Sequence, residues 1–127
     1  MSAFGDIVPR MIGRWHGLVI DCPDPRGLAG FYEALLGMVR VQDDDGRFVV
    51  IGDTPDRPGL AFALVEDWTP PQWPRESAHQ HLDVRVDDLA AAGAEVLALG
   101  ARRLDGGGER FDVYADPAGH PFCLVSW

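Results

Sequence analysis

The stretch "DCPDPRGLAGFYEALLGMVRV" (residues 21–41) decides the fold, because "RVDDLAAAGAEVLALGARRL" (residues 85–104) repeats its plan. Each stretch contains a strand end, an acidic residue, an amphipathic helix, Leu-Gly and a further strand. Asp24 and Asp88 take the N-cap positions, where a carboxylate accepts hydrogen bonds from the open N–H groups of the first turn. A repeat of about half the chain indicates a duplicated supersecondary unit rather than a short-period solenoid.

The spacing of apolar residues predicts one helix in each half, at about 25–36 and 88–99. Pro25 suits the first helical position, and Gly37 supplies a left-handed end. The apolar face of the first helix is Leu28, Phe31, Tyr32, Leu35 and Leu36, and the thinner face of the second is Leu89, Ala92, Val96 and Leu99. We interpret both faces as core.

Strands are predicted between the turn signals "DDDG", "DTPDRPG", "DGGGE" and "DPAGHP". They fall at about 15–21, 38–42, 47–52 and 60–66, and again at 79–86, 102–104, 110–115 and 121–127. The predicted class is therefore α+β, with two βαβββ modules (about 14–66 and 79–127) in a single domain, 1–127. A linker rich in proline and tryptophan, 67–78, joins the modules.

Composition limits the partners. A net charge of −9 over 127 residues disfavours nucleic acid and anionic membranes. Apolar runs are too short to span a membrane, and the start of the sequence has no secretory signal. Two cysteines, Cys22 and Cys123, are too few for a disulfide framework, although a single disulfide between them stays an alternative. We expect reduced thiols and a cytoplasmic location.

Four motifs in this order, "VIDCPDP", "FYEALLGM", "HLDV…VDDL" and "VYADPAGHPFCLV", resemble the vicinal oxygen chelate superfamily. This group includes glyoxalases, bleomycin-resistance proteins and extradiol dioxygenases, and the closer likeness is to small glyoxalase-like domain proteins. The resemblance covers about residues 15–127. It implies two curled mixed sheets around a cleft, with the helices outside, and a homodimer. It does not fix the chemistry, because one fold hosts unrelated functions.

The resemblance also implies where a metal would bind, since metal-dependent members take two ligands from each half. Carried to this chain, the four positions are Gly17, Ala63, His81 and Cys123. One imidazole and one thiol fall short of the three protein ligands that catalytic zinc generally takes. We therefore expect no metal cofactor. The alternative is a divalent metal completed by a second subunit or by the substrate.

His120 and Cys123 do not form a chelating pair. They are three residues apart, and an odd offset on an extended strand places side chains on opposite faces.

Alternation in "HLDVRV" places His81, Asp83 and Arg85 on one strand face, which the resemblance identifies as the cleft. His81 suits proton transfer or hydrogen bonding, with Asp83 orienting it, and Arg85 could pair with a ligand carboxylate. A face that is merely solvated is the alternative.

Further ligand-binding candidates are Cys123 and Trp127 on the last strand and Trp68 and Trp73 in the linker. The tryptophans are predicted to wall the cleft, or else to clamp the two halves together. Cys123 is a weak candidate nucleophile, because a cysteine in an apolar strand usually behaves as a small hydrophobe.

We expect a protein that binds an unknown small molecule without a complete metal site. Resistance proteins of the superfamily sequester aromatic or cationic drugs, and the acidic surface favours a cationic compound. The alternative is a lyase, an isomerase or a dioxygenase-type enzyme that uses His81, with or without a divalent metal. Whether the protein is an enzyme stays open, as does a purely structural or regulatory role.

Overall fold

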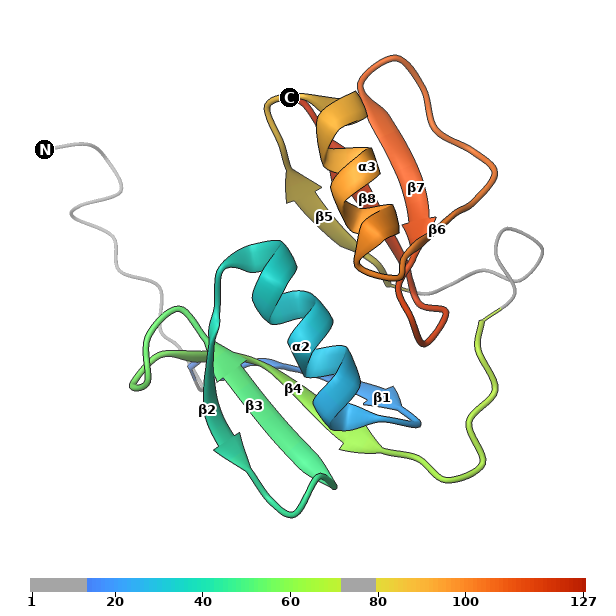
Figure 1. The fold of residues 1–127 in the computed structure, drawn as a ribbon. Coiled ribbons are helices and arrows are strands. Elements are labelled where there is room, and N and C mark those ends of the chain that lie inside the picture. Colours follow the sequence, from blue (N-terminus) through green and yellow to red (C-terminus); the bar gives the residue numbers. More distant parts are fainter. Residues whose placement is uncertain (1–13, 72–79) are drawn as a thin grey trace, which may run out of the picture.

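The computed structural model describes residues 14–71 and 80–127 and confirms the α+β class (Figure 1). The first module consists of β1 (Leu18–Cys22), α2 (Pro25–Leu36), β2 (Val39–Asp43), β3 (Phe48–Gly52) and β4 (Pro58–Leu64). The second consists of β5 (Leu82–Arg85), α3 (Leu89–Ala98), β6 (Arg102–Arg103), β7 (Phe111–Ala115) and β8 (Pro121–Val125). Neither helix of the described residues is long and apolar enough to cross a membrane.

The two modules share one strand topology. Their four-stranded sheets have the orders β1-β4-β3-β2 and β5-β8-β7-β6. In each sheet the first strand pairs in parallel with the last, and the remaining pairs are antiparallel. The tandem βαβββ prediction is therefore confirmed. Most of the predicted linker lies outside the described residues, so the limits of the linker and the modules stay a prediction.

Both helices begin at the predicted caps. The Asp24 carboxylate accepts from the N–H of Gly27 at 3.1 Å, and Asp88 accepts from the N–H of Ala91 at the same distance. Gly37 ends α2 with a φ of 69°, a conformation that glycine adopts without steric cost. These local signals set where each helix begins and where α2 ends.

One hydrophobic core extends across both modules. Tyr32 of α2 stacks on Phe62 of β4, with ring centroids 5.6 Å apart. Phe31 and Tyr32 also contact Phe122 of β8, at 5.8 and 6.5 Å. Residues from both modules therefore share one core.

Several strands are shorter than predicted. β8 ends at Val125, because β7 begins at its partner Phe111 and offers Trp127 no strand to pair with. β1 begins at Leu18 rather than at residue 15, and β6 has only two residues. His81 precedes β5, and His79 lies outside the described residues.

Candidate functional site

The second sheet separates its side chains by face. Leu82 and Val84 of β5 pack against the core, whereas His81, Asp83 and Arg85 are exposed. On β8, Phe122 and Leu124 belong to the core, and Cys123 belongs to a smaller apolar cluster. The predicted alternation therefore holds along β5, and it presents polar groups on the face away from α3.

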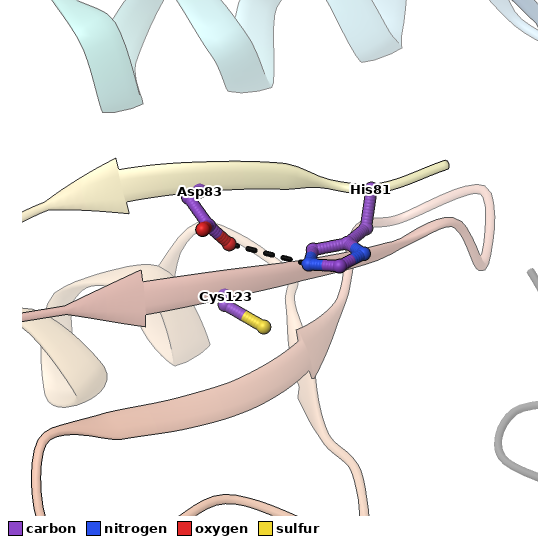
Figure 2. Close-up of side chains that lie close together, drawn as sticks. All are labelled: His81, Asp83 and Cys123. Carbon is purple, nitrogen blue, oxygen red and sulfur yellow. Dashed lines mark ion pairs between the residues drawn. The ribbon is translucent and has the colours of Figure 1, made fainter. Parts of the chain in front are cut away.

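His81, Asp83 and Cys123 lie together on this face (Figure 2). The Nε2 atom of His81 is 3.3 Å from Oδ1 of Asp83. Cys123 is the register partner of Asp83 on the neighbouring strand. One donor atom from each of the three residues lies within 4.8 Å of the others. The arrangement brings an imidazole, a carboxylate and a thiol into one small volume.

The Cys123 thiol is poorly suited to nucleophilic attack. Its residue is only 6% exposed, and burial, followed by the nearby Asp83 charge, raises its pKa. A raised pKa leaves less of the reactive thiolate at neutral pH. Cys22 is likewise buried, and burial raises its pKa to about 11. Both cysteines are free, so the disulfide that the sequence left open is absent.

A pocket of about 450 Å³ lies between the two modules, where β1 and β5 face it. Its apolar lining is Leu18, Val19, Ile20, Leu82 and Pro121, with the aromatic rings of Tyr32 and Trp68. Its polar lining is Asp21, Gln80, His81 and His120. The volume lies within the usual range for small-molecule sites, which combine apolar walls with a few polar groups.

A buried network closes one side of the pocket. Asp116, 3% exposed, accepts a hydrogen bond from the Tyr32 hydroxyl at 2.8 Å and from the backbone N–H groups of Ala118 and His120. His120 Nδ1 lies 2.8 Å from the same carboxylate, and its Nε2 lies 2.7 Å from the backbone carbonyl of Asp21. Both ring nitrogens face acceptors, so the imidazolium form fits this position.

The ionisation of the network follows from its surroundings. Burial lowers the pKa of His120, but the hydrogen bond and charge of Asp116, with help from Asp21, outweigh burial and raise it overall. Burial and the Asp116 charge raise the pKa of Tyr32, which keeps its hydroxyl as a donor. The network therefore supplies a paired cation and anion inside the module junction.

Sequence reasoning missed Asp116, His120 and Tyr32 as parts of a site. The local pattern indicates a turn for "DPAGHP" and a core position for Tyr32. Neither interpretation includes the contacts that these residues make with distant parts of the chain. The signal available was an aspartate and a histidine four apart beside an apolar strand. Their partners lie 84 and 99 residues away, so local spacing does not show them.

The remaining candidates lie in different parts of the chain. Trp68 lines the pocket, and its indole N–H donates to the Ala118 carbonyl at 2.9 Å, so it also fastens the end of the first module to the second. Arg85 is opposite Val125, and Trp127 is 55% exposed beside Phe111. Neither lines the pocket with His81. Trp73 lies outside the described residues.

The four metal positions implied by the resemblance do not form a complete donor set. Ala63 stands opposite Asp21 in the β1–β4 pair, and Gly17 precedes β1. A side-chain atom added at Gly17 would lie 3.1 Å from the Gly59 carbonyl, so a larger residue fits there only with movement. Neither residue offers a side-chain ligand atom, so the set implied by the resemblance is incomplete in this chain.

Comparison with known proteins decides the family. The family model described as "Glyoxalase-like domain" matches residues 17–125. The chain belongs to this family. The match spans both modules of the glyoxalase-like domain, in agreement with the likeness to the vicinal oxygen chelate superfamily. A search of curated proteins gives no significant match.

Solved structures share the fold of this glyoxalase-like domain. A glyoxalase/bleomycin resistance protein/dioxygenase family enzyme from Burkholderia phytofirmans PsJN is 17% identical, with a TM-score of 0.67 over 87% of this chain and 96% of that one. The trypanothione-dependent glyoxalase I of Leishmania major is 18% identical, with a TM-score of 0.64 over 90% and 87%. A mutant of the genomically encoded fosfomycin resistance protein of Listeria monocytogenes, in complex with Mn(II), is 11% identical, with a TM-score of 0.66 over 91% of each chain. At these identities the likeness establishes the fold alone.

Proposed function

We propose that this glyoxalase-like domain binds a small aromatic cation in the pocket between its modules, in the cytoplasm. The observation that carries the proposal is the combination of a pocket of about 450 Å³ with an aromatic wall and a carboxylate at its edge. The free state of both cysteines supports a reducing compartment.

The charges of the lining favour a cation. Tyr32 and His120 are engaged with Asp116, and the indole N–H of Trp68 is engaged with Ala118. The exposed Asp21 carboxylate is thus the main anionic group of the lining, and the Trp68 ring offers a π-face. A cation beside an indole face gains about 0.5–2 kcal/mol, depending on exposure. The net charge of −9 adds a long-range attraction.

Binding of benzyltrimethylammonium, measured by calorimetry, tests the proposal against phenylacetate, an aromatic anion of similar size. We expect the cation to bind more tightly. Asp21→Asn should weaken its binding about twofold to fivefold, as for an exposed ion pair. The substitution keeps the backbone carbonyl that His120 contacts. His81→Ala and Trp68→Ala should also weaken binding.

His16→Ala is the matched control, because His16 is exposed and does not line the pocket. Equal affinity for the cation and the anion, or an effect of His16→Ala as large as that of His81→Ala, would contradict the proposal.

A catalytic role is the second candidate, and the contact between His81 and Asp83 favours it. A carboxylate 3.3 Å from an imidazole nitrogen can hold the ring in one orientation for proton transfer. A lyase or isomerase using His81 would lose turnover in His81→Gln while its ligand affinity changed little. If His81→Gln lost affinity for the ligand and the wild type showed no turnover, binding would remain the function.

A further inference from the structure

The cluster of His81, Asp83 and Cys123 has donors that metals prefer. Imidazole nitrogen, carboxylate oxygen and thiolate sulfur are the three ligand types found at protein zinc sites. His81 and Asp83 share a strand face because they are two residues apart, and Cys123 is opposite Asp83 on β8. All three residues belong to the second module, so no group from the first module is needed to assemble the cluster (Figure 2).

The distances suit a tetrahedral ion. Two nitrogen or oxygen ligands about 2.0–2.1 Å from zinc, at tetrahedral angles, lie roughly 3.3–3.4 Å apart. The measured separation between His81 Nε2 and Asp83 Oδ1 is 3.3 Å. A sulfur about 2.3 Å from the same ion would lie roughly 3.6 Å from each of them. Since the donor atoms lie within 4.8 Å of one another, the largest adjustment is about 1.2 Å.

Two of the three ligands lie at the surface. The side chains of His81 and Asp83 are 41% and 48% exposed, so neither is locked in place by core packing. Cys123, by contrast, is held in an apolar cluster with Val113 and Val125. The thiol therefore acts as the fixed point toward which the two exposed ligands turn.

We propose that the second module alone binds a zinc-class divalent ion through His81, Asp83 and Cys123. His81 and Cys123 are two of the four positions implied by the resemblance, whereas the two positions in the first module, Gly17 and Ala63, contribute no ligand here. Asp83, at none of those four positions, supplies the missing third ligand. Three protein ligands leave a fourth position for water or a bound molecule. The thiolate selects zinc or cobalt over magnesium, calcium and manganese, which prefer oxygen.

Titration of the chelator-treated protein with Co²⁺ tests the site without any assay of activity. Tetrahedral binding through Cys123 is expected to produce a thiolate-to-cobalt charge-transfer absorption, which Zn²⁺ abolishes by competition. Cys123→Ser should remove this absorption. Asp83→Asn should weaken Co²⁺ binding by at least about tenfold, since losing even an outer-shell partner of a metal ligand typically costs that much. Mn²⁺ and Mg²⁺ should not compete at equal concentration.

Matched controls separate the site from general damage. Cys22→Ala removes the other thiol, which is buried in the shared core, and should leave the absorption unchanged. Asp87→Asn alters an exposed carboxylate just beyond β5 and should leave Co²⁺ affinity unchanged. Circular dichroism shows whether each variant is folded.

Absence of the absorption in the wild type, or its persistence in folded Cys123→Ser, would overturn the metal proposal. The two proposals can fail separately. Benzyltrimethylammonium binding depends on Asp21 and Trp68 and should survive Cys123→Ser, whereas Co²⁺ binding should survive Asp21→Asn.

Discussion

At the scale of single residues, the Asp116 carboxylate accepts several hydrogen bonds at the module junction. It accepts hydrogen bonds from a phenol, from two backbone N–H groups and from an imidazole while nearly excluded from water. A buried charge is tolerated only when such partners replace its hydration. Removing one partner should therefore cost more than an average surface hydrogen bond.

Tyr32→Phe should lower the free energy of unfolding by about 1–3 kcal/mol, because it leaves Asp116 without one of its donors. Urea denaturation measures the change. Tyr114→Phe is the control, since Tyr114 is equally buried and stacks on the same Phe122, but its hydroxyl bonds to no acceptor among the described residues. Equal losses in the two variants would show that the hydrogen bond to Asp116 contributes nothing.

The pH dependence of the free energy of unfolding should reveal the contribution of His120. Its folded pKa is raised above the ordinary 6.5 by Asp116 and Asp21, so its stabilisation is complete below about pH 6.5. That stabilisation is lost as pH rises through the raised value. Urea denaturation at a series of pH values should show His120→Gln less stable than wild type by about 1–3 kcal/mol at about pH 5.5, with a smaller gap at about pH 9. A gap that widens with rising pH would contradict this sign.

At the scale of elements, the two helices use glycine differently. Gly93 of α3 faces Tyr114, and a Cβ added there would collide with the tyrosine hydroxyl. Gly30 of α2 has open space, with no atom within 4 Å of an added Cβ. The same residue type thus permits close packing in one helix and only weakens the other.

Alanine substitutions at these glycines should have opposite signs. Gly30→Ala should stabilise the protein by about 0.5–1 kcal/mol, because alanine favours the helix. Gly93→Ala should destabilise it by about 1–3 kcal/mol despite the same gain, because the core is overpacked. Thermal unfolding of both variants checks the pair, and stabilisation by Gly93→Ala would show that Tyr114 can move aside.

The elements were largely predictable from the sequence, whereas the site was only partly so. Caps at Asp24 and Asp88 and alternation along "HLDVRV" are local signals, and they indicated the helices, the strand faces and the neighbourhood of His81 and Asp83. Strand ends depend on how far the partner strand extends, which one segment does not encode. The Asp116 network depends on contacts between modules, and no local pattern predicts it.

At the scale of the whole molecule, several large apolar side chains are exposed. Trp15 is 80% exposed, Trp127 55% and Val39, on the edge strand β2, 41%. Edge strands and exposed apolar groups favour association with another copy.

We therefore predict a homodimer, as the resemblance to the superfamily also implies. Light scattering should give about twice the chain mass of 13.9 kDa. A mass of one chain across a wide range of concentrations would reject the dimer.

The shared aromatic core has a consequence for synthesis on the ribosome. Phe31 and Tyr32 of α2 are covered by Phe122, and Tyr32 bonds to Asp116, 84 residues later. At about 5–20 residues per second, those 84 residues take roughly 4–17 seconds to translate. During that interval the first module emerges without Phe122 packed against the rings of Phe31 and Tyr32. The nascent chain should therefore recruit chaperones after the first module has been synthesised and before the second is complete. Its final compaction should wait until the "DPAGHPF" segment leaves the exit tunnel.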